Sequence, residues 1–255
     1  MRTLTLLAPA KINLSLDVVG RRSDGYHLLR TVMQSVSLCD RVTVREEAPG
    51  TGIRLECSDG SLPTDCRNTA YRAAQGFLAA ARRDPSRDAP GLSIRIGKAI
   101  PAEAGLAGGS SDAAAVLTGL SRLYPGEVPL RRIPELAVAV GADVPFCLFG
   151  GTALCEGIGE IVTPLPPLTG HPLLLLNPGF GIPTPAAFRT FDDQAEPRHP
   201  DTEAVCDAVR RRDLSALART ARNVLEPIAL AAHPRLADAR SEEHTSELQS
   251  QSHIS

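Results

Sequence analysis

The residues best suited to chemistry lie in one glycine-rich stretch from Pro101 to Leu117, with the sequence P-A-E-A-G-L-A-G-G-S-S-D-A-A-A-V-L. Glycine lets the backbone adopt a positive φ and approach a ligand closely. The alanine-rich end favours a helix, whose N-terminus presents unpaired N–H groups and a partial positive charge. With Ser110 or Ser111 as the helix cap, this order predicts an anion site, most often one for phosphate. An ordinary capped turn is the alternative.

The glycine-rich stretch differs from two well-known phosphate motifs. A P-loop requires a lysine directly after its last glycine, and none is present here. The dinucleotide fingerprint G-x-G-x-x-G directly after a strand is also absent. Leu92, Ile94 and Ile96 alternate with polar residues, which predicts a strand that enters the loop.

Two other places combine polar side chains with apolar neighbours. A first strand is expected over 3–7 and an interruption over 8–10. The alternation over 11–20 then puts Lys11 and Asn13 on one face of a strand. Asp143 follows a predicted helix over 133–140 and lies among apolar residues, where a carboxylate is costly unless it is paired or functional. A solvated lysine and a turn-capping aspartate are the alternatives.

The rest of the pattern predicts an α+β protein with two lobes. Further strands are expected over 28–40, 42–46, 53–57 and 171–177, with 42–46 and 53–57 paired around a turn and a hairpin over 152–163. Further helices are expected over 69–81 with Asn68 as cap, from about 185, over 202–211 and over 214–224. The lobes divide near 164–170, which gives domains over 1–165 and 166–239.

Composition excludes several classes of function. The 255 residues include 27 basic and 29 acidic side chains, and this balance does not favour nucleic acid as a partner. No apolar run reaches the roughly 18 residues that cross a bilayer, and the N-terminal apolar run is too short for a signal peptide. The six cysteines show no C-x-x-C spacing, which favours free thiols in a reducing cytoplasm. The oligomeric state stays open.

Four motifs in order resemble the GHMP kinases, the family of galacto-, homoserine, mevalonate and phosphomevalonate kinases. They are P-A-K-I-N-L-S-L at 9–16, D-G-Y-H at 24–27, the glycine-rich stretch and G-A-D-V-P-F at 141–146. The resemblance covers residues 1 to about 239. It is strongest to the branch that phosphorylates the 2-hydroxyl of 4-diphosphocytidyl-2-C-methyl-D-erythritol in the non-mevalonate isoprenoid pathway. It implies an N-terminal lobe like domain 2 of ribosomal protein S5 and a ferredoxin-like C-terminal lobe.

The resemblance also implies roles for individual residues. Asp143 would take the proton of the substrate hydroxyl, Lys11 would hold that carboxylate ionised, and Ser111 would meet Mg²⁺. The implied ATP-binding residues are Pro101, Gly105, Leu106, Ala107, Gly108, Gly109, Ser110, Ser111 and Asn68. The implied residues for the small-molecule substrate and its cytidine are Asn13, Tyr26, His27, Asp143, Thr184 and Phe188.

One expected motif is missing. The family has another glycine-rich loop near its C-terminus, but this chain has no glycine after Gly181. The residues from Arg240 onward match the translation of a common sequencing adapter, so 240–255 is expected to be a non-native tail on a truncated second lobe. Uncovered apolar faces after Thr202 would then lower stability and activity. Another GHMP kinase for a small alcohol, or a non-catalytic nucleotide-binding remnant, remains an alternative.

Overall fold

The computed structural model describes residues 1–81, 89–177, 179, 184–194, 197–234 and 236. The expected tail over 240–255 lies outside these residues. The strands are β1 (Thr3–Arg21), β2 (His27–Glu47), β3 (Ile53–Cys57), β4 (Gly91–Gly97), β5 (Thr152–Gly157) and β6 (Ile161–Leu165). The helices are α1 (Thr69–Ala80), α2 (Gly108–Leu123), α3 (Ile133–Val140), α4 (Val144–Phe149), α5 (Thr184–Asp192), α6 (Thr202–Arg211), α7 (Leu214–Thr220) and α8 (Glu226–Ala232), with a 3₁₀ turn over Leu130–Arg132.

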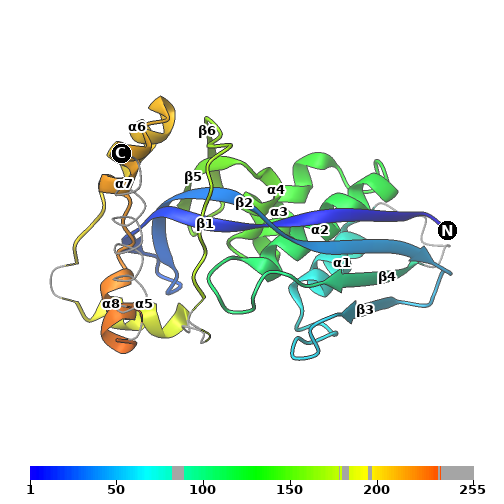
Figure 1. The fold of residues 1–255 in the computed structure, drawn as a ribbon. Helices are drawn as coiled ribbons and strands as arrows, with labels where there is room; N and C mark the ends of the chain where they lie inside the picture. The colour runs from blue at the N-terminus through cyan, green and yellow to red at the C-terminus, as the bar shows by residue number, and fades with distance from the viewer. Residues whose placement is uncertain (82–88, 178, 180–183, 195–196, 235, 237–255) are drawn as a thin grey trace.

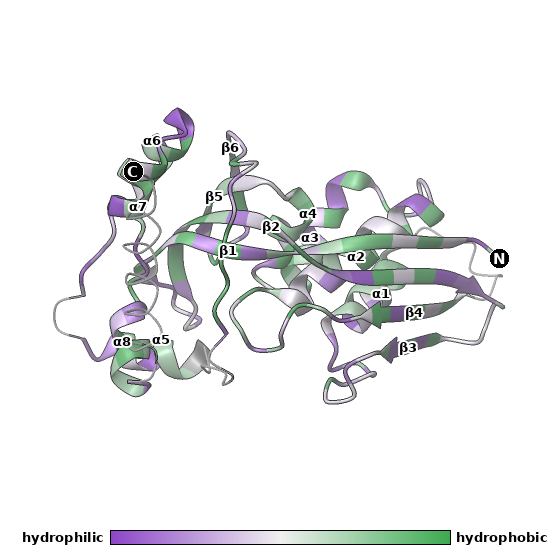
Figure 2. Cartoon of the chain, viewed as in Figure 1, coloured by the Kyte–Doolittle hydropathy of each residue, from purple (hydrophilic) through white to green (hydrophobic). Residues whose placement is uncertain are grey.

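A long hairpin of β1 and β2 runs through the whole molecule (Figure 1). Along both strands, hydrophobic residues are interspersed with polar ones (Figure 2), as expected for a sheet that is partly buried. The expected interruption at 8–10 is a register shift between Pro9 and Lys11, so the strand continues through it. Because a bulge shifts the pairing without ending it, the alternating segment over 11–18 stays in the sheet.

The other edge of β2 is shared by two strands. Residues 41–47 of β2 pair with β4, and residues 29–34 pair with β5. Between these two blocks, Asp40 accepts hydrogen bonds from the backbone N–H groups of Ala99 and Ile100, at 2.6 and 2.8 Å. The split in the sheet therefore lies where the chain leaves β4 and enters the glycine-rich loop.

The expected pairing of 42–46 with 53–57 is wrong. Strand β4 lies between these segments, antiparallel to β2 and parallel to β3. A parallel pair needs a crossover connection, and α1 supplies it between β3 and β4. The short turn at 48–52 suggested a hairpin, but the crossover takes β3 to the outer edge of β4.

Helices α1–α4 pack together against the part of the sheet that contains β3, β4 and the part of β2 that pairs with β4 (Figure 1). Their shared core contains Val44, Phe77, Ile94, Leu117 and Leu120, all with no exposed surface. Local signals locate these helices well. Asn68 caps α1 by accepting from the backbone N–H of Ala70 at 2.9 Å, and α3 ends at Gly141 as expected. Helix α4 was not among the helices expected from the sequence.

The described residues between 166 and 236 form helices and no strand. The segment expected as a buried strand over 171–177 has no regular secondary structure, and its four leucines are 39–68% exposed, so this expectation is wrong. Helix α7 ends at Thr220, four residues before its expected end. Chain segment 222–224 rejoins β1, where Leu16 N–H donates to Arg222 O at 3.0 Å. The domain boundary at 165 stays a prediction.

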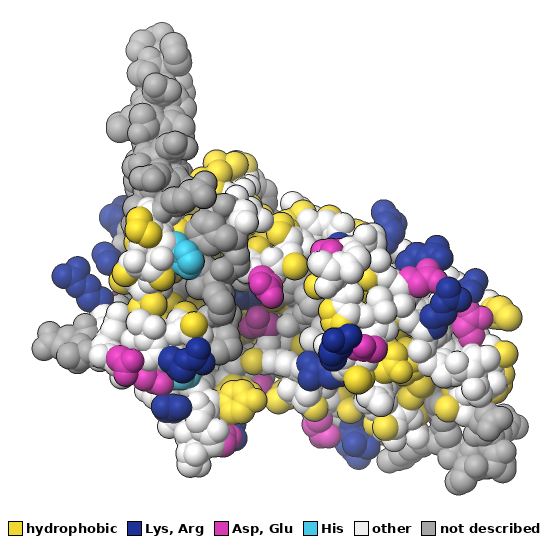
Figure 3. Space-filling model, turned by 90° about the horizontal axis from the view of Figure 1, so that it is seen from below, with side chains coloured by type: hydrophobic (Ala, Val, Ile, Leu, Met, Phe, Trp, Pro, Cys, Tyr) yellow, Lys and Arg dark blue, Asp and Glu magenta, His cyan; other side chains and the backbone are white. Residues whose placement is uncertain are grey.

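Neither sign of charge dominates the face seen in Figure 3, where basic and acidic side chains are interspersed. Within the described residues, no helix has the length and apolarity needed to cross a membrane. The α+β class expected from the sequence is confirmed.

Candidate active site

The glycine-rich loop occupies 101–107, between β4 and α2. Its backbone adopts positive φ at Glu103, Gly105 and Ala107, at 55°, 72° and 56°. Helix α2 begins at Gly108, so Ser110 and Ser111 lie in its first turn and not at its cap as expected. Ala107 takes the cap position without a side-chain hydrogen bond, which leaves the first N–H groups of a 16-residue helix available to an anion.

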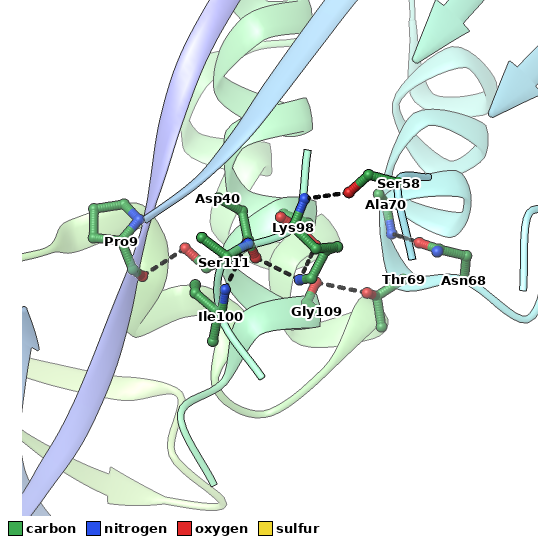
Figure 4. Close-up of polar contacts among 12 residues, drawn as sticks. Pro9, Asp40, Ser58, Asn68, Thr69, Ala70, Lys98, Ile100, Gly109 and Ser111 are labelled. Carbon is green, nitrogen blue, oxygen red and sulfur yellow. Dashed lines mark hydrogen bonds and ion pairs between the residues drawn. The ribbon is translucent and has the colours of Figure 1, made fainter. Parts of the chain in front are cut away.

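Close packing explains why the helix starts with glycine. A Cβ at Gly108 would lie 3.1 Å from both Ile100 Cγ2 and Lys98 Nζ. At Gly109 it would lie 3.1 Å from Thr69 Oγ1, and this hydroxyl donates to Gly109 O at 2.6 Å. The Thr69 hydrogen bond holds the start of α2 against α1, and the closeness of Lys98 and Ile100 leaves little room for a side chain at Gly108 (Figure 4).

Three buried, charge-bearing side chains lie together next to the glycine-rich loop. Lys98 Nζ donates to Asp40 and also to Asp112 Oδ2, the latter at 2.9 Å. The side chains of Lys98, Asp40 and Asp112 are 8%, 0% and 4% exposed. This group, called here the Lys98 cluster, ties β2, β4 and α2 together at the base of the loop.

The Lys98 cluster holds two carboxylates for one cation. Burial raises the pKa of Asp112 to about 7, although Lys98 opposes the shift. Burial disfavours the charge of Lys98, but Asp112 and Asp40 outweigh it and raise the pKa of that amine. Asp112 Oδ1 is buried without a hydrogen-bond partner in the described part of the chain.

The two serines after the glycines face different ways. Ser111 is 1% exposed and donates to the carbonyl of Pro9 on β1 at 2.7 Å (Figure 4). Ser110 is half-buried and, together with Asp112, lines a cavity of about 640 Å³ that is described below. The serine expected to meet Mg²⁺ thus holds α2 to β1, and the hydroxyl on the cavity side belongs to Ser110.

Lys11 of β1 forms an ion pair with Asp143, the residue directly before α4. Lys11 Nζ lies 3.8 Å from Asp143 Oδ2 and donates to Asn13 Oδ1 at 3.3 Å. Lys11 is only 6% exposed, whereas the Asp143 side chain is 34% exposed and open to a ligand. The backbone N–H of Lys11 donates to Leu106 O at 3.1 Å, which ties the strand to the glycine-rich loop. Burial raises the pKa of the nearby Cys147 thiol to about 12, so that thiol stays neutral.

A cavity of about 640 Å³ brings most of the predicted site residues together. Its lining includes the predicted residues Lys11, Asn13, Asn68, Pro101, Gly105, Leu106, Ala107, Gly108, Gly109, Ser110, Asp143 and Phe188. Asn68 contributes from the start of α1, where its side-chain N–H also donates to Pro63 O at 2.8 Å. The volume suits a ligand of the size of a nucleotide.

The residues expected to grip the cytidine lie at the far end of the β1–β2 hairpin. The His27 ring stacks on Phe188 of α5, with ring centroids 4.6 Å apart and an interplanar angle of 16°. His27 borders a second, smaller cavity of about 350 Å³. Tyr26 is 60% exposed and is not among the described residues that line either of these two cavities. Thr184 begins α5, but its side chain lies outside what the structure describes.

A metal ion at this site would have few protein ligands among the described residues. No group of three or more His, Cys, Asp or Glu side chains in the described part of the chain is placed to hold a metal ion. Mg²⁺ in kinases is often held by one or two protein oxygens together with phosphates and waters. The Ser110 hydroxyl and the unpartnered Asp112 Oδ1 fit that limited role.

Sequence reasoning missed the Lys98 cluster and Asp192. A lysine at the end of a strand and an aspartate in an alanine-rich helix are both usually exposed to solvent, so neither residue suggests a buried cluster. The signal available for Asp112 was a carboxylate in the apolar run A-A-A-V-L. Asp192 accepts from His27 Nε2 at 2.7 Å, but it is 165 residues away in sequence, and no local pattern links them.

Comparisons with known proteins agree with this architecture. The family model for the GHMP kinases N terminal domain matches residues 68–151. A 4-diphosphocytidyl-2-C-methyl-D-erythritol kinase of Clostridium botulinum (strain Eklund 17B / Type B) is 41% identical over 95% of this chain and 84% of that protein. The enzyme of the same name from Clostridium novyi (strain NT) is 45% identical over 89% of this chain and 78% of its own length.

Solved structures show the same relationship. A crystal structure of 4-(cytidine 5'-diphospho)-2C-methyl-D-erythritol kinase aligns with a TM-score of 0.71 and 36% identity, over 95% of this chain and 83% of that one. Homoserine kinase from Cytophaga hutchinsonii shares the fold, with a TM-score of 0.55 and 18% identity over 87% of this chain and 71% of that one. The GHMP kinase fold expected from the sequence is therefore confirmed, and the chain belongs to the 4-diphosphocytidyl-2-C-methyl-D-erythritol kinase family.

Proposed function

We propose that this protein transfers the γ-phosphoryl group of ATP to the 2-hydroxyl of 4-diphosphocytidyl-2-C-methyl-D-erythritol. The main support is the Lys11–Asp143 pair, which lines the same cavity as the glycine-rich loop. An accessible carboxylate held beside a buried ammonium is suited to accept the proton of an alcohol. The free cysteines support an expected cytoplasmic location.

In this proposal Asp143 is the general base, and Lys11 orients it. Lys11 Nζ lies 3.8 Å from Asp143 Oδ2, and the 34% exposure of the Asp143 side chain lets a hydroxyl approach the carboxylate. Asn13 steadies Lys11 through the 3.3 Å hydrogen bond to its Oδ1. The substrate hydroxyl would give its proton to Asp143 as its oxygen bonds to the γ-phosphorus and ADP leaves.

The phosphates of ATP would lie against the start of α2. The unpaired N–H groups after Ala107 and the helix dipole there favour negative charge. Bound Mg²⁺ would neutralise charge on the phosphates, with Ser110 and Asp112 as its available protein ligands. Asn68 would lie near the adenine, and Tyr26, His27, Thr184 and Phe188 would hold the cytidine.

The direct test measures ATP-dependent phosphorylation of 4-diphosphocytidyl-2-C-methyl-D-erythritol by ADP release, together with binding of cytidine diphosphate by calorimetry. Asp143→Asn should lower kcat by about 10²–10⁴-fold, because the amide cannot take the proton. Binding of cytidine diphosphate should stay within about threefold, since Asp143 acts on the hydroxyl and not on the base.

The matched control is Asp207→Asn, a change of the same chemistry at a half-exposed position on α6. It should leave both kcat and binding unchanged. Turnover that survives Asp143→Asn would remove Asp143 from the reaction. A wild-type chain that neither phosphorylates this substrate nor binds cytidine diphosphate would overturn the proposed substrate.

A further inference from the structure

One face of α5 holds the His27 ring by two contacts. Phe188 and Asp192 are four residues apart on this helix, so their side chains project from the same face. Phe188 stacks on the plane of the ring, while Asp192 Oδ1 bonds to His27 Nε2 at 2.7 Å. The stack fixes the tilt of the ring, and the hydrogen bond fixes its rotation.

The second oxygen of Asp192 is also engaged. Arg21 Nη1 donates to Asp192 Oδ2 at 3.1 Å, and Arg21 is the register partner of His27 across the hairpin. The hydrogen bond from His27 lowers the pKa of Asp192, so this carboxylate stays ionised and accepts only. The Asp192 charge is therefore shared between a guanidinium and the imidazole.

This arrangement decides which nitrogen of His27 can accept a hydrogen bond. An ionised carboxylate accepts only, so the Nε2 that faces it carries a hydrogen. In the neutral ring, Nδ1 then has a free lone pair. Within the described part of the chain, Nδ1 has no hydrogen-bond partner, so it is the ring nitrogen left for a ligand.

We propose that Asp192 is a positioning residue that places the hydrogen of the neutral His27 ring on Nε2 and so leaves Nδ1 as an acceptor for the amino group of cytosine. The proposal rests on the proposed function, in which His27 contacts the cytidine. Cytosine carries an exocyclic amino group where uracil carries a carbonyl oxygen. An acceptor at Nδ1 therefore favours cytosine and leaves uracil facing a second acceptor.

The first test needs no variant. Long-range ¹H–¹⁵N spectra of the full chain at about pH 8 distinguish a protonated from an unprotonated ring nitrogen in each histidine. We expect His27, assigned by the loss of its signals in His27→Gln, to be neutral with hydrogen on Nε2. A His27 ring that carries hydrogen on Nδ1, alone or with Nε2, would overturn the proposal whether or not the chain is active.

The second test uses Asp192→Asn, whose amide can donate to Nε2 and so favour the opposite tautomer. The binding ratio of cytidine diphosphate to uridine diphosphate should fall by about tenfold or more. A merely structural role would weaken both ligands equally and leave this ratio unchanged. The ¹⁵N spectrum of the variant should show hydrogen moved toward Nδ1.

Asp193→Asn is the matched control, because its exposed carboxylate is the next residue along the chain. It should keep the wild-type ratio and the wild-type His27 spectrum. A ratio that persists in Asp192→Asn, while wild-type protein turns over its substrate, rejects the role of Asp192 and leaves the proposed function standing. Absence of cytidine diphosphate binding in wild-type protein instead rejects the proposed function, and the spectrum still decides the tautomer.

Discussion

Charged side chains are buried at one end of the candidate site and more exposed at the other. At the glycine-rich loop, the three side chains of the Lys98 cluster are at most 8% exposed. Around His27, Arg21 is 57% exposed and Asp192 is 29% exposed. We call the first region, with the loop itself, the phosphate half, and the second, with Tyr26 and Phe188, the base half.

The difference follows from how each half is assembled. The phosphate half is formed where β2, β4 and α2 meet, next to the largest core of the molecule. The base half is a contact between the tip of the β1–β2 hairpin and α5, which are more than 150 residues apart in sequence. The core holds the first in place, whereas the second depends on a few surface contacts between distant segments.

Removing a charge should therefore change the free energy of unfolding much more in the phosphate half than in the base half. Removing one partner of a buried ion pair leaves an uncompensated charge and is strongly destabilising. Exposed ion pairs contribute little, because water and salt screen them. The halves should thus differ in stability effects even though both contact the substrate in the proposed function.

The largest effect is expected for Lys98→Met, which keeps the length of the side chain but removes its charge. Asp40 and Asp112 would then face each other without a cation, and Asp40 has no exposed surface. The free energy of unfolding should fall by about 3 kcal/mol. Urea unfolding at about pH 8, followed by circular dichroism, measures it.

Arg95→Met is the control, at a position in β4 three residues before Lys98. Arg95 is 74% exposed and pairs with Glu56 at 3.0 Å. Its removal should leave the unfolding midpoint almost unchanged. Equal losses for Lys98→Met and Arg95→Met would mean that burial in the Lys98 cluster does not govern its contribution.

A smaller effect is expected from the titration of Asp112. Its pKa is raised to about 7 by burial, while the unfolded carboxyl titrates near about 3.9. Between these values the native chain binds a proton that the unfolded chain has lost. The free energy of unfolding attributable to Asp112 therefore falls as pH rises from about 4 to about 7 and is constant above that range.

Asp112→Asn removes this contribution, because its amide does not titrate but can still accept from Lys98. The variant should lose less stability than wild-type protein between about pH 5 and pH 8, as measured by urea unfolding at each pH. Asp207→Asn on the surface of α6 is the control and should follow the wild-type profile. Parallel profiles for Asp112→Asn and wild type would show that Asp112 is already ionised at the lower pH.

The sequence predicts the phosphate half better than the base half, for a physical reason. Asn68 as a cap, the loop before α2 and Gly141 after α3 are all set by neighbours within a few residues. Such local signals can be recognised without knowledge of the fold. The Lys98 cluster cannot be recognised in this way, because Lys98 and Asp40 are 58 residues apart and come together only at the split in the sheet.

Strand pairing was the weakest part of the prediction. The leucines at 173–176 have the composition of a buried strand, but no described strand pairs with them and they are exposed. Strand 53–57 was paired with the wrong neighbour, because the parallel partner arrives only after α1. In both cases the sequence indicates an extended segment, while its partner is decided by tertiary packing.

The smallest stability effect is expected for Arg21→Ala, in the base half. Arg21 contacts Asp192 and donates to Gly25 O at 3.2 Å, but most of its side chain is in water. The unfolding midpoint should therefore match that of wild-type protein within experimental error. Binding of cytidine diphosphate should weaken only a few-fold, because Asp192 keeps its bond to His27. A loss of stability as large as that of Lys98→Met would break the contrast, since it would mean that the hairpin tip and α5 are held together as firmly as the buried end of the site.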